Sequence, residues 1–297
     1  MSRMKGMFLL LLANILIFVT LSITFTVLVE ILLPMFGVDL RGSINQTMLL
    51  WSFVIGFGGA FISLAFSKQM ARAMVSGQRI ERPGSPIESV IFDSIREISR
   101  GMEISMPEVW IYDAPDPNAF ATGPSKNNSM VAVSTGLLQN LNERELQAVL
   151  AHEMGHIRNG DMLTTTILAG LMNTFVYFLS QFIARHIANR NPMLYFATYI
   201  FLQIVLSFLA MIPICWFSRK REFAADAFAA RVYGPDSMIA ALQAIGTWVQ
   251  QSQIDYGTKD ALATMKISGR TGGFMSLIST HPRIEERIEA LRRSNIA

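Results

Sequence analysis

The sequence is poor in charge and in cysteine. Only 16% of its 297 residues are charged, against about 25% in a typical soluble protein. This deficit indicates that part of the chain avoids water, and it excludes the polar, highly charged composition of a disordered protein. A single cysteine excludes an internal disulfide framework. Since no basic run alternates with aromatic residues, we expect no nucleic-acid partner.

Where charge is missing, the chain has four apolar stretches, each longer than the roughly 20 residues that a helix needs to cross a bilayer. They comprise residues 6–29, 42–67, 162–184 and 191–218. The first is too long for a signal peptide and lacks a small-residue cleavage site. The third carries several polar side chains, which fit either a membrane span or a helix buried within the protein. The second contains small residues that would let a neighbouring helix approach closely: Gly56, Gly58, Gly59 and Ala60.

With about four transmembrane helices, the Lys and Arg residues that flank them fall on one side of the membrane. They stand before the first stretch, after the second and after the fourth, at positions 3, 5, 68, 72, 79, 82 and 219–221. Because positively charged flanks stay in the cytoplasm, both termini and both hydrophilic segments are expected there. Arg185 and Arg190, in the second loop on the opposite side, disagree mildly with this orientation.

The two hydrophilic segments carry the local signals of an α+β unit and of a helical region, so we expect a predominantly helical α+β membrane protein. The first segment predicts a helix that starts at a capping box at residues 85–88, a strand at 109–112, a hairpin at 118–122 and 130–133, and a helix capped by Asn142 and Glu145 that ends near Gly160. The second predicts helices at 222–232 and 236–250, a loop or linker at 252–273, and an amphipathic helix with Ile284, Ile288 and Leu291 on one face.

The helix capped by Asn142 carries His152, Glu153 and His156, an H-E-x-x-H motif. Residues four apart share one face of a helix, so both imidazoles can reach one Zn²⁺. Glu153 then lies beside the metal, where its carboxylate can take a proton from water that the zinc has made more acidic. The alternative is a solvated helix face that happens to hold two histidines.

Two histidines leave a catalytic zinc site one protein ligand short. Glu222 and Asp226 stand four apart on a predicted helix, so the first can ligate the metal while the second accepts a hydrogen bond from a ligand imidazole. Taken alone, these acids would favour the simpler alternative, ion pairs to the basic residues 219–221 on a wet surface. Beside the histidine pair, we expect them to complete a site for one Zn²⁺ per chain.

These motifs resemble those of the HtpX-type membrane-bound zinc metalloproteases of bacteria, which belong to the gluzincin group together with the CAAX prenyl-protein proteases. The resemblance covers essentially the whole chain and is carried by residues 118–123, 131–138, 152–156, 218–226 and 280–282. It implies a zincin-like catalytic domain in which His152, His156 and Glu222 are the metal ligands, Glu153 is the general base and Asp226 orients the first histidine.

The resemblance also implies residues that bind the substrate. In similar gluzincins a strand before the zinc helix binds the peptide in extended form, and here this is residues 130–134, with Val131 and Val133. Three further positions match residues that line the cleft in the prenyl-protein relatives, namely Asn118, His281 and Arg287. His281 or Arg287 would stabilise the oxyanion of the reaction. Alternatively, His281 only caps a helix and Arg287 is one solvated charge among glutamates.

The predicted organisation has four parts in chain order. They are a transmembrane hairpin at 1–72, a cytoplasmic catalytic domain with the substrate-binding hairpin and zinc helix at 73–161, a second membrane hairpin at 162–218, and a cytoplasmic helical region with the third zinc ligand at 219–297. Together with the resemblance, this organisation implies a zinc metalloendopeptidase of the bacterial inner membrane, with its active site on the cytoplasmic face.

The expected substrates are misfolded or damaged membrane proteins and unfolded polypeptides within or near the lipid bilayer. The chain has no phosphate-binding P-loop of its own, so its substrates must arrive with accessible loops or already misfolded. The resemblance implies a stress-response role in quality control that overlaps with an ATP-dependent membrane protease. Two alternatives stay open. A dedicated processing protease for one substrate would be favoured by seven spans around a chamber, and a non-catalytic, zinc-stabilised membrane scaffold by a fourth protein ligand on the metal.

Overall fold

The computed structural model describes residues 27, 31, 33–35, 46–75, 77–188, 191–256 and 279–294. Its helices are α2 (Leu33–Met35), α3 (Gln46–Met74), α4 (Pro86–Gly101), α5 (Thr135–Asn140), α6 (Glu143–Asn159), α7 (Asp161–Ala188), α8 (Pro192–Tyr233), α9 (Pro235–Tyr256) and α11 (Ile284–Ser294). Its strands are β1 (Gly77–Ile80), β2 (Glu108–Tyr112), β3 (Ala119–Ser125) and β4 (Asn128–Ser134). Apart from residue 27, the predicted first span at 6–29 lies outside the described residues, as does most of the predicted linker at 252–273.

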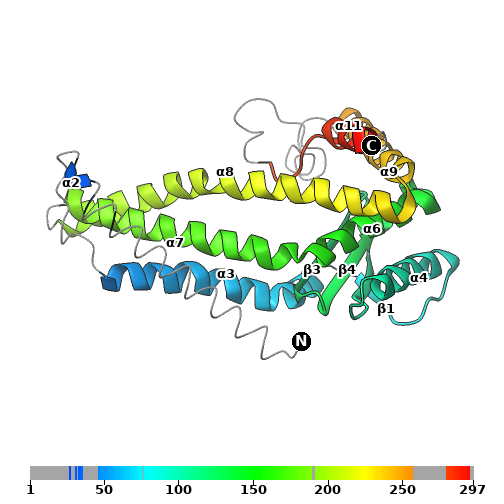
Figure 1. Ribbon diagram of the computed structural model, residues 1–297, viewed down its shortest axis with the longest axis horizontal. Helices are drawn as coiled ribbons and strands as arrows, with labels where there is room; N and C mark the ends of the chain where they lie inside the picture. Colours follow the sequence, from blue (N-terminus) through cyan, green and yellow to red (C-terminus); the bar gives the residue numbers. More distant parts are fainter. Residues whose placement is uncertain are drawn as a thin grey trace. The chain divides into compact units, whose positions relative to one another are not determined.

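Among the described residues, three helices are long and apolar enough to cross a membrane. They are residues 47–74 of α3, the whole of α7 and the whole of α8. They contain the whole of the stretch predicted as the third span and most of those predicted as the second and fourth. The described part of the chain is therefore predominantly helical with one small sheet, as expected (Figure 1). The structure differs from the prediction after residue 218, because α8 continues without a break to Tyr233. Residues 219–232 contain no proline or glycine, so nothing in the sequence ends the helix there.

Two of these helices contact each other through a small residue in one of the chain's two compact units, which includes residues 46–59 and 169–210. A Cβ atom on Gly56 of α3 would lie 2.5 Å from the backbone nitrogen of Thr174 in α7, so only glycine permits this approach. The prediction of close helix packing is thus confirmed for Gly56, whereas Gly58 and Gly59 have no atom within 4 Å of such a Cβ. Large apolar side chains on the same helices are exposed, for example Trp51, which is typical of a lipid-facing surface.

The second unit includes residues 60–168 and 211–297 and contains the sheet. The strand order is β1-β2-β4-β3, with β2 and β4 parallel and the other pairs antiparallel. Helix α6 packs beside β3 and β4, while α4 and α9 pack against α6 (Figure 1). The core consists of the apolar faces that the sequence predicts, including Ile91 and Ile95 of α4 and Leu146 and Leu150 of α6, which are fully buried.

The strand order corrects one predicted role. Residues 130–134 lie in β4, which pairs with β2 on one side and with β3 on the other. No edge of this strand is open to a peptide, and both Val131 and Val133 are fully buried in the core. The predicted binding of a substrate to Val131 and Val133 by β-augmentation is therefore wrong. The edge strand next to the H-E-x-x-H helix is β3 instead.

A cluster of charges joins the end of α3 to β2. Nζ of Lys68 lies 2.9 Å from Oε1 of Glu108, and Arg72 forms a second ion pair with the same carboxylate. Burial alone would raise the pKa of Glu108, but the hydrogen bonds from Arg72 and Lys68 and the charge of Lys68 outweigh it and lower the pKa to about 2.

We expect the Glu108→Gln variant to be about 1 kcal/mol less stable than the wild type at neutral pH, since the pair is partly exposed. Because the folded-state pKa lies below the ordinary value of 4.5, this stabilisation is complete above that value and is lost as the pH falls toward about 2. Thermal unfolding as a function of pH measures it, with exposed Glu97→Gln as the control. A difference between wild type and Glu108→Gln that stays constant down to pH 3 would contradict the assignment.

Candidate metal centre

Helix α6 holds two of the predicted ligands, and its ends are fixed by the sequence signals that predict it. The Asn142 side chain accepts a hydrogen bond from the backbone N–H of Glu145, whose carboxylate accepts one in return from the N–H of Asn142. The predicted capping box is thereby confirmed. At the other end Gly160 adopts a left-handed conformation with φ of 69°, which ends α6 and starts α7 one residue later.

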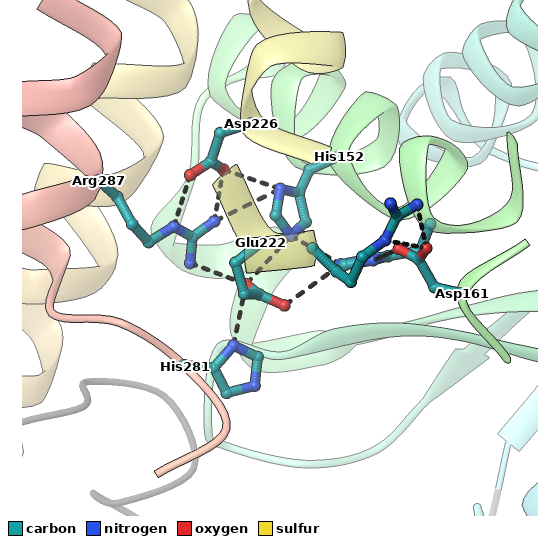
Figure 2. A network of polar contacts seen from close by, with 8 residues as sticks. His152, Asp161, Glu222, Asp226, His281 and Arg287 are labelled. Atoms are coloured by element: carbon teal, nitrogen blue, oxygen red, sulfur yellow. Dashed lines mark hydrogen bonds and ion pairs between the residues drawn. The ribbon is translucent and has the colours of Figure 1, made fainter. Parts of the chain in front are cut away.

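His152 and His156 of α6 and Glu222 of α8 come together, and each can offer one ligand atom to the same ion. The two Nε2 atoms lie 3.2 Å apart. Nε2 of His152 lies 3.5 Å from Oε2 of Glu222, and Nε2 of His156 lies 3.4 Å from Oε1. The residues that the sequence predicts as ligands, from two distant segments, therefore converge on one point; Figure 2 shows His152 and Glu222 facing each other there.

These separations fit a small tetrahedral cation. Bonds of about 2.0–2.1 Å at tetrahedral angles place two donor atoms about 3.3–3.4 Å apart, which is the value that zinc with histidine and carboxylate ligands requires. Oε2 of Glu222 is buried and accepts no hydrogen bond within the described part of the chain, although several cationic groups lie near it. A buried carboxylate oxygen without a hydrogen bond is costly unless a cation binds it.

Electrostatics at the centre favour positive charge. Burial alone would lower the pKa of His156, but its hydrogen bonds to Asp161 and Glu222 raise the pKa to about 10. Burial likewise opposes a proton on His152, yet its contacts with the carboxylates of Asp226 and Glu222 raise its pKa. The carboxylates that favour a proton on these imidazoles would equally favour a divalent cation between them.

Glu153 is also buried, between the two histidines in sequence. Burial raises the pKa of its carboxyl group above the ordinary value, and the charge of Glu222 acts in the same direction. The charges of His152 and His156 oppose that shift. The predicted general base thus lies within the electrostatic field of the ligand cluster.

The first histidine, His152, contacts a carboxylate that is in turn bound by an arginine. Nδ1 of His152 lies 2.8 Å from Oδ1 of Asp226, the partner that the sequence predicts. Arg287 binds both oxygens of Asp226, at 2.7 and 2.6 Å, and is only 7% exposed. The alternative in which Arg287 is a solvated surface charge is therefore wrong, and its guanidinium is engaged with Asp226 and lies 3.4 Å from Glu222.

The two other predicted site residues occupy different surroundings. Nδ1 of His281 lies 2.9 Å from Oε2 of Glu222, so His281 is at the centre although its side chain stays about one-third exposed (Figure 2). Asn118, just before β3, donates a hydrogen bond of 2.9 Å to the hydroxyl of Tyr112, so its side chain is engaged with β2.

Sequence reasoning missed two residues at the centre, Asp161 and Arg221. Asp161 is the first residue of α7 and contacts His156, while Arg221 precedes Glu222 on α8 and contacts Asp161. In the sequence, Asp161 has the appearance of an ordinary acid at a helix start. The signal that identifies it is the glycine before it, because Gly160 ends α6 and places Asp161 at the start of the next helix, beside the last turn of α6.

Gly155, inside the H-E-x-x-H motif, sets the distance between α6 and α8. A Cβ atom there would lie 3.1 Å from Cα of Ala225 and 3.2 Å from the ring of Phe228. Gly155→Leu should force the two helices apart, which would cost about 1–3 kcal/mol of stability. It should also weaken metal binding, because His156 is on α6 and Glu222 is on α8. Zinc retention and thermal unfolding measure both effects.

The control for this substitution is Gly101→Leu in α4, where nothing lies within 4 Å of an added Cβ. If Gly155→Leu keeps zinc and melts like Gly101→Leu, the close approach of α6 and α8 does not set the ligand geometry.

Comparisons with known proteins identify the family of this chain. The model of the family described as "Peptidase family M48" matches residues 87–295. The "Protease HtpX" of Alkalilimnicola ehrlichii is 45% identical over 97% of this chain and 98% of its own length. The "Protease HtpX homolog" of Nitrosomonas europaea is 43% identical over 97% of this chain and 99% of its own length.

A solved structure shares the fold. The crystal structure of S. mikatae Ste24p has a TM-score of 0.62 and 19% sequence identity, and the match covers 82% of this chain. The matched part spans 58% of that protein.

Proposed function

This chain is a member of peptidase family M48 and a metalloprotease of the membrane, and on that premise we propose that it is a zinc-dependent endopeptidase that degrades misfolded or damaged membrane proteins. The observation that carries the proposal is the convergence of His152, His156 and Glu222 with donor separations of 3.2–3.5 Å, next to Glu153. A site with three protein ligands leaves a position open for reaction, whereas a structural zinc site is closed by four.

The residues of the metal centre have separate roles in peptide hydrolysis. His152, His156 and Glu222 would hold the zinc, which supplies a Lewis acid that polarises a carbonyl oxygen and makes water more acidic. Glu153 takes the proton of the attacking water and returns it to the leaving amine. Asp226, fixed by Arg287, keeps the proton of His152 on Nδ1 and so keeps Nε2 directed at the ion.

His281 is the residue best placed to stabilise the oxyanion. It reaches the centre from outside α6 and α8, and it is more exposed than the other groups there. A partly exposed imidazole at the rim can turn toward the substrate, whereas Arg287 is buried and holds Asp226 with two hydrogen bonds. We therefore assign the oxyanion role to His281 and a structural and orienting role to Arg287.

The substrate backbone would pair with β3 rather than with β4. Strand β3 is at one end of the described sheet and lies alongside α6, so its outer edge offers backbone groups next to the centre. Extended, unfolded segments fit such an edge, whereas folded loops do not. N-methylation of alternate amides in a peptide substrate should reduce its cleavage, and unchanged cleavage of all such peptides would contradict pairing at this edge.

We place the protein in the bacterial inner membrane with the centre and both termini in the cytoplasm. The three apolar helices and the basic residues after α3's apolar part and α8's apolar part support this orientation. A fourth span at residues 6–29 completes the proposed topology. A reporter fused near Arg190 should be found outside the cytoplasm, and a cytoplasmic reporter there would contradict the four-span arrangement.

Cleavage assays on the purified full-length protein test the function. The protein should cleave a loosely folded membrane protein, lose this activity with a chelator and regain it with zinc. A stably folded form of the same substrate should be cleaved far more slowly, because the chain itself has no ATP-binding loop to drive unfolding. Equal cleavage of both forms would contradict the quality-control role, and chelator-resistant cleavage would contradict the metal-dependent reaction.

A further inference from the structure

A buried aspartate, Asp161, and a half-buried arginine, Arg221, form an ion pair next to the second ligand histidine. Asp161 is 7% exposed. Its Oδ2 accepts a hydrogen bond of 2.7 Å from Nδ1 of His156, and its Oδ1 accepts one of 2.5 Å from Nε of Arg221. A second guanidinium nitrogen of Arg221 forms an ion pair with the same oxygen. Each oxygen of the carboxylate therefore has a different partner.

This pair repeats, on His156, the arrangement that Asp226 and Arg287 make on His152. Both histidines direct Nδ1 at a buried carboxylate, and each carboxylate is held by a buried or half-buried arginine. Both histidines leave Nε2 facing Glu222 (Figure 2). The two chains of contacts come from different elements, because Asp161 begins α7 while Asp226 lies within α8.

We propose that Asp161 is a positioning residue for the ligand His156 and that Arg221 fixes the Asp161 carboxylate. An ionised carboxylate only accepts hydrogen bonds, so it keeps the proton of His156 on Nδ1 and leaves the lone pair of Nε2 for the metal. This inference rests on the proposed function, because it takes zinc to be the ion that His156 binds. Partners of this kind contribute about 10–100-fold to metal affinity.

The pair also links the metal centre to two apolar helices. Asp161 is the first residue of α7, and Arg221 follows the apolar part of α8. The orientation of His156 therefore depends on how the start of α7 packs against α8 at residues 211–233. A purely structural ion pair would stabilise this contact without changing the affinity of the centre for zinc.

The test measures the zinc dissociation constant of the full-length protein by competition with a chelator. Asp161→Asn keeps the shape of the side chain and removes its charge, and it should weaken zinc binding by about tenfold. Asp161→Ala should weaken it by up to about 100-fold. The control is Asp93→Asn, which breaks an exposed aspartate–arginine pair on α4 and should leave zinc affinity unchanged.

Substitutions of Arg221 test the same contacts, from Arg221 through Asp161 to His156, independently. Arg221→Met should weaken zinc binding, and Arg221→Lys should restore part of the affinity because it keeps the charge. Since Arg221 acts through Asp161, the double variant Asp161→Ala/Arg221→Met should bind zinc no more weakly than Asp161→Ala alone. The absorption spectrum of the cobalt-substituted protein should shift in the Asp161 variants and not in Asp93→Asn.

The outcomes separate this inference from the proposed function. If the wild type binds zinc and cleaves its substrate while Asp161→Asn and Asp161→Ala bind zinc as tightly, only the positioning role is overturned. If these variants lose thermal stability with unchanged zinc affinity and an unchanged cobalt spectrum, the pair is structural and the inference is again overturned. If the wild type binds no zinc, the proposed function fails and this inference fails with it.

Discussion

Glu153→Gln is expected to slow peptide cleavage by about 10²–10⁴-fold while zinc stays bound, because general acid–base catalysis contributes a factor of this size. The amide keeps the shape of the side chain, but it cannot accept the proton of the attacking water. The ligand atoms of His152, His156 and Glu222 are untouched, so the metal site should survive. Cleavage rate and zinc content of the purified full-length protein measure the two effects together.

The matched control is Glu143→Gln, a substitution of the same type at an exposed position in the first turn of α6. It should leave cleavage and zinc content close to those of the wild type. Cleavage by Glu153→Gln at the wild-type rate would rule out Glu153 as the general base. Loss of zinc from this variant would instead make Glu153 part of the ligand set.

Arg287→Met should lower the free energy of unfolding by about 3–5 kcal/mol, the usual cost of removing one partner of a buried ion pair. The substitution leaves the buried Asp226 carboxylate without the two hydrogen bonds that Arg287 donates at 2.7 and 2.6 Å. Asp226 would then lose its fixed position against His152. We therefore expect weaker zinc binding as well as lower stability, measured by thermal unfolding and chelator competition.

Arg292→Met, at an exposed position on the same helix α11, is the control and should change neither quantity. The result also decides between two roles for Arg287. A variant that is as stable as Arg292→Met, with normal zinc affinity and a lower turnover rate, would support oxyanion stabilisation by Arg287 and contradict the role assigned above.

The parts of the molecule that depend on local pattern could be predicted from the sequence. The capping box at Asn142 and Glu145 determines where α6 begins, and helical periodicity puts His152 and His156 on one face. The long apolar stretches in α3, α7 and α8 are recognisable from composition alone. Glu222 was identified because its spacing to Asp226 suits a ligand and its hydrogen-bond partner.

The parts that depend on non-local arrangement could not be predicted. The position of β4 between β2 and β3 follows from a parallel pairing that no local signal reveals, so Val131 and Val133 were assigned to an edge that does not exist. Arg287 has the sequence surroundings of a solvated residue, with Glu285 and Glu286 beside it, and only packing onto Asp226 buries it.

Asp161 was missed for a related reason. Helical spacing relates residues three or four apart, whereas Asp161 follows His156 by five and stands beyond the end of α6. Gly160 adopts a positive φ that ends α6, and Asp161 then begins α7 within hydrogen-bond distance of the imidazole. A glycine that ends a ligand-bearing helix therefore directs attention to the residue that follows it.

The central claim is that His152, His156 and Glu222 hold the catalytic zinc, and the zinc content of purified full-length variants tests it most directly. The chain has four histidines, and His186 on α7 is exposed and is not a member of the ligand cluster, so His186→Ala is the matched control. We predict one zinc per chain in the wild type and in His186→Ala, and loss of zinc in His152→Ala, His156→Ala and Glu222→Ala. Retention of one zinc per chain, at wild-type affinity, in any of these three ligand variants would contradict the claim.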